Sequence, residues 1–129
     1  MKKPNYIPEG YHTITPYIMA ENIEEYSTFL QNAFNGMVTS TTNSANGKPL
    51  NIGLKIGSSM VMIAEARGDF EPMTMSFYMY VENVDSSYEI AVKNGAKSLY
   101  EPSDQFYGSR DCGVIDVRGN YWFIGTLIE

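Results

Sequence analysis

The sequence predicts an α+β fold in which two βαβββ modules follow one another within a single domain, residues 1–129. The main observation is an internal repeat. Glu21-Asn22-Ile23-Glu24 is matched by Glu82-Asn83-Val84-Asp85, and Ile56–Met60 is matched by Arg118–Trp122. Both matches have an offset of about 61 residues, so each half carries the same signals in the same order.

The first module, about residues 11–66, is predicted to begin with a strand over His12–Met19, which is rich in β-branched and aromatic residues. A helix follows. Asn22 is its expected N-cap and Glu25 completes a capping-box pair. Asn35-Gly36 is expected to end the helix, because glycine adopts the left-handed cap conformation. Turn-forming residues then separate three further strands, which are expected at Met37–Thr42, Leu50–Ile56 and Met60–Ala66.

The second module, about residues 74–129, follows a turn-rich linker at residues 67–73 and repeats this plan. Its first strand is predicted at Thr74–Val81. Asn83 is the expected N-cap of its helix, and Gly95 is expected to end that helix. The remaining strands are expected at Lys97–Tyr100, Gly113–Val117 and Tyr121–Ile128. A half of about 60 residues is marginal alone, so we expect the modules to pack together.

Composition excludes several classes of function. The net charge of −6 disfavours nucleic acid and anionic membranes as partners, because both would repel the chain. One cysteine, Cys112, cannot form an internal disulfide, and one histidine, His12, cannot build a histidine-rich metal site. Arg110 could lower the pKa of the Cys112 thiol, but a lone strand cysteine is expected to be inert. Without an export signal or an apolar span, we expect a cytoplasmic protein.

Two such modules in tandem resemble the vicinal oxygen chelate superfamily, which includes glyoxalase I, extradiol dioxygenases and bleomycin-resistance proteins. The similarity covers about Tyr11–Glu129 and is greatest to the PhnB-like branch. Gly119-Asn120-Tyr121-Trp122 resembles the family's Gly-His-x-Trp, with Asn120 in place of the histidine. The resemblance implies paired sheets curled around a cavity and a homodimer. The other segments that carry it are His12–Tyr17, Leu54–Gly57, Tyr80–Asp85 and Asp104–Arg110.

Metal-dependent members of that superfamily bind one divalent ion through four side chains, from the first and last strands of each module. Aligning the two halves places these positions at Thr15, Val61, Ser76 and Phe123. A divalent ion prefers imidazole or carboxylate ligands, so we expect neither a metal nor another cofactor. Glu65 shares the predicted strand face of Val61, and a shifted register could bring it into the cavity. Its alternative role is a solvated acid at a strand end.

Strand alternation predicts which side chains face the cavity. The hydroxyl-bearing and aromatic sides of the first strands are assigned to it, and Val61, Ile63 and Glu65 are expected to join them. Asp104–Arg110 is predicted to be a loop that closes over a ligand, with a dimer contact or a solvated turn as the alternative. The candidate ligand-binding residues are Thr15, Tyr17, Glu65, Ser76, Tyr78, Gln105, Phe106, Tyr107, Arg110 and Phe123.

These observations favour a metal-free protein that sequesters or senses a small molecule, as bleomycin-resistance proteins do. Two alternatives remain open. The chain could be a metal-dependent enzyme of the glyoxalase or dioxygenase kind with non-standard ligands. It could also be a structural or regulatory dimer with a vestigial cavity. Nucleophilic catalysis is disfavoured, because Thr15 and Ser76 have no expected base beside them.

Overall fold

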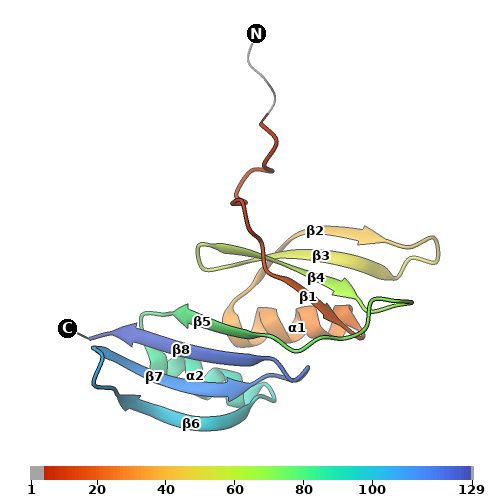
Figure 1. The fold of residues 1–129 in the computed structure, drawn as a ribbon. Coiled ribbons are helices and arrows are strands. Elements are labelled where there is room, and N and C mark those ends of the chain that lie inside the picture. Colours follow the sequence, from red (N-terminus) through yellow and green to blue (C-terminus); the bar gives the residue numbers. More distant parts are fainter. Residues whose placement is uncertain (1–4, 129) are drawn as a thin grey trace.

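The chain forms two four-stranded sheets, each with one helix, in the order that the repeat predicts (Figure 1). The computed structural model describes residues 5–128. The α+β class and the two βαβββ modules are therefore confirmed. The first module contains β1 (Tyr17–Ala20), α1 (Ile23–Phe34), β2 (Met37–Asn43), β3 (Pro49–Ile56) and β4 (Ser59–Glu65). The second contains β5 (Ser76–Tyr80), α2 (Val84–Lys93), β6 (Lys97–Asp104), β7 (Ser109–Ile115) and β8 (Tyr121–Leu127).

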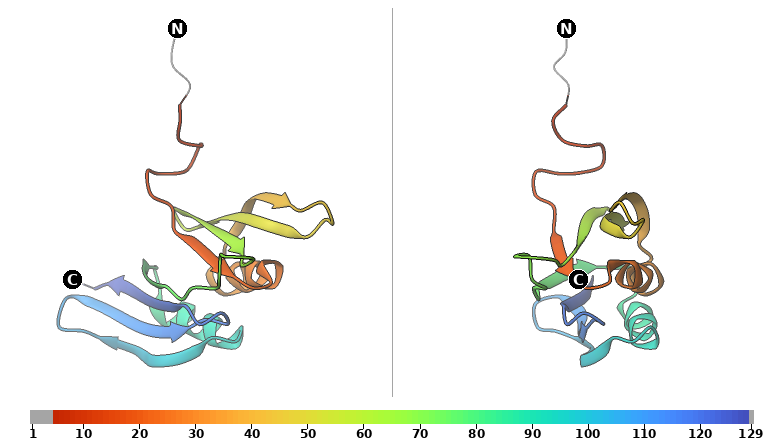
Figure 2. Two further views of the ribbon diagram at one scale, coloured as in Figure 1. Left: turned by 45° about the vertical axis from the view of Figure 1, so that its right-hand side comes forward. Right: turned by 90° about the vertical axis from the view of Figure 1, so that its right-hand side faces the viewer.

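Both sheets have the same topology. Their strand orders are β1-β4-β3-β2 and β5-β8-β7-β6, so the last strand of each module lies beside the first. These two strands pair in parallel, with Tyr17 opposite Met62 in one module and Tyr78 opposite Phe123 in the other. The remaining pairs are antiparallel. Figure 2 shows both helices on the same side of the sheets, which leaves each sheet with one helix-free face.

One hydrophobic core runs through both modules beneath the helices. Ile18, Leu54 and Ile63 are fully buried on the helix side of the first sheet. The Trp122 ring on β8 lies with its centroid 4.7 Å from that of Phe34 on α1 and 4.4 Å from that of Phe77 on β5. Because this indole contacts an aromatic ring of each module, the modules share their core.

A buried polar network also joins the modules. Asp116, between β7 and β8, accepts a 2.6 Å hydrogen bond from the Tyr26 hydroxyl on α1 and a 2.8 Å bond from Trp122 Nε1. Asn120, which stands in place of the family histidine, accepts from the backbone N–H of Met75 at 2.8 Å and donates to the Tyr26 hydroxyl. Every polar side chain of the network has a hydrogen-bond partner, so Asn120 has a structural role here.

The first strand is shorter than the sequence predicts. It begins at Tyr17, and Thr15 precedes it. Pro16 has no backbone N–H to offer to a sheet ladder, which places the start of regular pairing after it. The predicted loop Asp104–Arg110 is also shorter in the structure. Asp104 ends β6 and Ser109 begins β7, so the segment is the tip of a hairpin.

The N-terminus of α1 is also capped differently from the prediction. Asn22 has φ 50° and its side chain makes no capping hydrogen bond. Glu65 takes that role from β4, because its two carboxylate oxygens accept the N–H groups of Asn22 at 2.8 Å and Ile23 at 3.0 Å. At the other end of α1, Asn35 adopts the left-handed conformation with φ 56°. The prediction for α2 is confirmed, since Asn83 accepts from the Ser86 N–H at 3.1 Å.

Candidate functional site

The helix-free face of the first sheet carries a hollow of about 530 Å³, a size that suits a small organic molecule. Strands supply most of its lining, and the linker covers one end through Arg67 and Phe70. The Asn51 amide donates a 3.1 Å hydrogen bond to the Tyr17 hydroxyl across its floor. The other lining residues are Met19, Ser40, Thr42, Leu50, Met62, Ala64 and Glu65. Thioether, aromatic and neutral polar groups therefore dominate the surface.

The predicted facing of β4 is wrong by one residue. Val61 and Ile63 belong to the buried core, and Met62 lies on the open face opposite Gly53. The equivalent pair in the second sheet is Gly113 opposite Phe123, where the predicted facing holds. The chain that connects Gly53 to Met62 through the β3–β4 hairpin is one residue shorter than the chain that connects Gly113 to Phe123 through the β7–β8 hairpin. A shift of one residue moves every side chain of a strand to the other face.

The four positions expected from the superfamily do not form a metal site. Thr15 lies before β1, Val61 is buried in the core, and Ser76 and Phe123 lie in the other sheet. With the corrected register, Met62 takes the place of Val61, and it offers only a thioether. Within residues 5–128 no three His, Cys, Asp or Glu side chains are grouped to hold an ion. The donors present thus do not fit the divalent metal of the superfamily.

Glu65 borders the hollow, but its carboxylate is directed to α1. Both of its oxygens accept backbone N–H groups at the start of that helix. A carboxylate there is favoured by the helix dipole and by the free amides. Glu65 therefore caps α1 and also lines the hollow, and its role in ligand binding stays a prediction.

The helix-free face of the second sheet carries a carboxylate surrounded by phenols. Asp111 on β7 is fully buried and accepts hydrogen bonds from the hydroxyls of Tyr78 (2.9 Å), Tyr107 (2.6 Å) and Tyr100 (3.2 Å). Burial and the neighbouring Asp111 charge raise the pKa of Tyr100 to about 12, and the same causes raise the pKa of Tyr78 further. The phenols therefore keep their protons at neutral pH. Phe123 lies on this face, with its ring centroid 6.5 Å from that of Tyr100.

At the hairpin tip, residues 105–108, the side chains expected to form a lid point in different directions. Tyr107 turns inward to Asp111, whereas Phe106 is 98% exposed and makes an edge contact with the Tyr107 ring. The Gln105 amide donates to the Ser103 hydroxyl at 3.1 Å. These side chains give the hairpin tip one anchored ring and one exposed ring.

Arg110 is directed away from the open face. Its guanidinium makes two 2.8 Å hydrogen bonds to Asp85 at the start of α2 and one of 3.1 Å to Asp104. The two bonds from Arg110 to Asp85 lower the pKa of the Asp85 carboxyl. Arg110 thus joins β7 to α2 and β6, and the candidate role in ligand binding has no support from its position.

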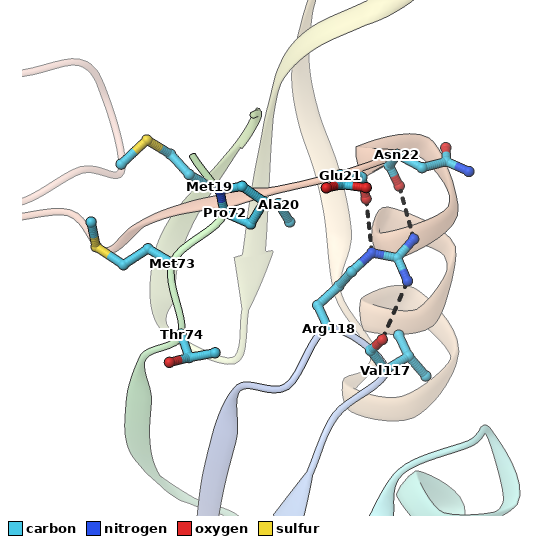
Figure 3. A pocket seen from close by; sticks show the side chains of 9 residues that line it. All are labelled: Met19, Ala20, Glu21, Asn22, Pro72, Met73, Thr74, Val117 and Arg118. Carbon is cyan, nitrogen blue, oxygen red and sulfur yellow. Dashed lines mark hydrogen bonds between the residues drawn. The ribbon is translucent and has the colours of Figure 1, made fainter. Parts of the chain in front are cut away.

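A second hollow, of about 490 Å³, lies where the modules meet (Figure 3). Arg118 lines it together with Met19 and Met73, and its guanidinium donates to the backbone carbonyls of Glu21 at 2.8 Å and Asn22 at 3.3 Å. The same group pairs with Glu25 at 3.1 Å. Since the donors of Arg118 are directed to α1, this hollow marks a structural junction.

Neither the single cysteine nor the single histidine of the sequence belongs to a candidate site. Cys112 is fully buried on the helix side of β7, and burial raises the pKa of its thiol to about 11. The suggestion that Arg110 could lower this pKa is wrong, because that guanidinium is bound to carboxylates of α2 and β6. His12 is exposed and precedes β1.

Sequence reasoning missed Asp111, which directly follows the predicted loop Asp104–Arg110. A signal was present in the alternation of Asp111 with Gly113 along one strand face. A Cβ on Gly113 would lie 2.8 Å from Tyr100 Cε1, and one on Gly125 would lie 2.6 Å from the Tyr78 hydroxyl. The two glycines leave the space in which these rings cover the sheet. Ser76 lies on the same face and is exposed.

No protein-family profile matches this sequence, and no curated protein matches it. Solved structures do match the fold. TioX from Micromonospora sp. ML1 has a TM-score of 0.79 at 16% identity, covering 91% of this chain and 99% of TioX. A glyoxalase/bleomycin resistance protein/dioxygenase family enzyme from Burkholderia phytofirmans PsJN has a TM-score of 0.71 at 18% identity, covering 87% and 95%.

A PhnB protein from Bacillus cereus has a TM-score of 0.70 at 16% identity, covering 89% of this chain and 99% of that protein. These structures share the tandem modules over nearly their whole length, while their identities to this chain are low. The likeness therefore lies in the architecture. This chain has the fold of the vicinal oxygen chelate superfamily, the glyoxalase, bleomycin-resistance and dioxygenase proteins.

Proposed function

We propose that this protein binds a small organic molecule without a metal ion, as a sequestering or sensing protein. The hollow over the first sheet carries this proposal. It is lined by Tyr17, Met19 and Met62, which suit a flat apolar group, and by the Asn51 amide, which can orient a neutral polar group. The donor set at the superfamily's metal positions supports the metal-free form, because it lacks imidazole and carboxylate groups.

We further propose that the protein acts as a homodimer. Large apolar side chains at the two ends of β8, on the helix-free face, support an interface there, since Tyr121 is 41% and Leu127 63% exposed. Light scattering coupled to size-exclusion chromatography measures this directly. A monomer at micromolar concentration would contradict it. The expected cytoplasmic location stays a prediction. No helix in the described part of the chain is long and apolar enough to span a membrane.

The first prediction is that small flat aromatic molecules stabilise the protein in the presence of a chelator. A panel of such compounds is screened by thermal melting in EDTA. A compound at a hundred times its Kd is expected to raise Tm by about 10 °C. Substitution of Met62→Arg fills the hollow with a charge, so the shift should be lost. Met37→Arg, at an exposed position of the same sheet, is the matched control and should keep it.

Two results would overturn the proposal. One is stoichiometric zinc, iron, manganese or nickel in protein purified without added metal, measured by elemental analysis. This result would favour the metal-dependent enzyme. The other is a panel that leaves Tm unchanged while the dimer is intact, which would favour a structural dimer with a vestigial cavity.

A further inference from the structure

Asp111 is a buried negative charge that the described residues leave without a cation. Its side chain is fully buried, and its three hydrogen-bond partners are neutral phenols. Within residues 5–128 the salt bridges of Arg110 go to Asp85 and Asp104, and that of Arg118 goes to Glu25. A buried carboxylate is costly unless charge or hydrogen bonds compensate it. Here hydroxyl groups alone do so.

The phenols bring the effect of this charge to the surface. Tyr78 and Tyr107 are 45% and 51% exposed, although their hydroxyls reach the buried carboxylate. Each hydroxyl has used its proton on Asp111, so its oxygen can only accept a further hydrogen bond. Hydrogen bonds to an ionised acceptor polarise such a chain and strengthen the next acceptor. The outer edge of the cluster therefore favours donors and repels anions.

Aromatic rings flank these acceptors. The Tyr80 ring, 70% exposed, has its centroid 5.1 Å from that of Tyr78 at an angle of 49°. On the other side Phe106 meets Tyr107 edge-on with centroids 5.1 Å apart. Ring faces attract organic cations through their quadrupoles. Acceptor oxygens between exposed rings, above a buried carboxylate, suit an alkylammonium or guanidinium group better than a neutral or anionic one.

We propose that the Asp111 cluster, formed by Asp111, Tyr78, Tyr100 and Tyr107, binds the cationic nitrogen group of an organic ligand. The positive group would rest against the phenol oxygens, with Tyr80 covering its apolar part. This inference rests on the proposed function, since it assigns a preferred ligand chemistry to a small-molecule binding protein. It concerns the second sheet, so it can be tested separately from the hollow over the first.

The test uses three probes with one ring and different charges: 2-phenylethylammonium, 2-phenylethanol and phenylacetate. Each is titrated at pH 7 and constant ionic strength into the ¹⁵N-labelled full chain, and backbone amide shifts are followed by NMR. We expect the ammonium probe to shift the amides of Gly113 and Gly125, which lie under the tyrosines. The alcohol should bind at least about tenfold more weakly, and phenylacetate should not bind there.

Two variants separate charge from packing. Asp111→Asn keeps the shape and removes the charge, so it should weaken binding of the ammonium probe by about tenfold. Residue 80 makes no hydrogen bond to Asp111, so Tyr80→Leu leaves the buried cluster intact. This change should weaken binding of the ammonium probe by about threefold. If the asparagine variant does not fold, as judged by its amide spectrum, the leucine variant decides.

Equal binding of the alcohol and the ammonium probe would overturn the proposal. Unchanged affinity in a folded Asp111→Asn variant, or no shift at the two glycines, would do the same. Such a failure is distinguishable from failure of the proposed function. Compounds held in the hollow of the first sheet are lost with Met62→Arg and keep their affinity with Asp111→Asn.

Discussion

At two places in the described part of the chain, buried carboxylates accept hydrogen bonds from tyrosine hydroxyls, and both make the tyrosines hard to ionise. Asp116 accepts from Tyr26 on the helix side, and Asp111 accepts from three phenols on the open side. Burial is the largest cause of the raised pKa of Tyr26, Tyr78 and Tyr100, and the nearby negative charge adds to it. Ionising such a tyrosine would place two negative charges side by side away from water.

This arrangement predicts a delayed tyrosine titration. The chain has ten tyrosines. Tyr26, Tyr78 and Tyr100 should stay protonated well above pH 10, so absorbance at 295 nm should rise in two stages. The pKa values of these three tyrosines are higher in the folded chain than the ordinary 10.0, so their protonated hydroxyls stabilise the fold fully below pH 10. This contribution to the free energy of unfolding is lost as pH rises toward 12 and beyond.

The control for this titration is the chain unfolded in guanidinium chloride, in which all tyrosines should ionise in one stage. The second stage of the folded protein should coincide with loss of its circular dichroism. Full ionisation below pH 11 with the fold intact would contradict the assigned clusters.

At the scale of helices and strands, the repeat predicts type and order because the hydrophobic periodicity is strong in both modules. Facing is harder to predict. The difference of one residue between the two hairpins reverses the open face of β4, so Met62 replaces Val61. The local sequence does not indicate whether a hairpin is longer or shorter than the equivalent hairpin of the other module. The predicted placement of Phe123 on the open face is confirmed, because its hairpin matches the assumed count.

Capping shows a second limit of local patterns. Asn22 and Glu25 fit a capping box, but Glu65 supplies the cap from a strand that is distant in sequence. A residue that acts on a helix from another element leaves no signal at helical spacing. Asp111 was missed for a related reason, because its three partners come from separate segments of the chain.

The cap leads to a prediction for α1. Replacing Glu65→Gln keeps one acceptor oxygen but removes the charge at the positive end of the helix dipole. The free energy of unfolding should fall by about 1 kcal/mol. Urea denaturation followed by circular dichroism measures it. Glu89→Gln, on the exposed side of α2, is the matched control and should change stability by less than about 0.5 kcal/mol. Equal losses in both variants would contradict the cap.

At the scale of the whole molecule, the modules are held together by packing and by one polar junction. The rings of Phe34, Phe77 and Trp122 form an aromatic cluster across the modules. Beside it, Asp116 accepts from Tyr26 and from Trp122, as well as from the backbone of its own turn. The two modules should therefore unfold together, although each has its own complete sheet.

The corresponding prediction concerns Asp116→Ala. This change leaves the hydroxyl proton of Tyr26 and the indole N–H of Trp122 without an acceptor, so the free energy of unfolding should fall by about 3 kcal/mol. Urea denaturation should still show one transition by both fluorescence and circular dichroism. Asp69→Ala, in the exposed linker, should be neutral. Two separate transitions in the unmodified chain would mean that the modules fold independently.

The central position of β8 has a consequence for synthesis of the chain. β8 is the last element of the described residues, yet it lies between β5 and β7 and carries Trp122. While a ribosome is making the chain, the first sheet can close once Glu65 has emerged. The second sheet has a gap at its centre until residues 121–127 have followed. The flank of α1 that Trp122 covers therefore lacks this indole until the last strand of the described residues has been made.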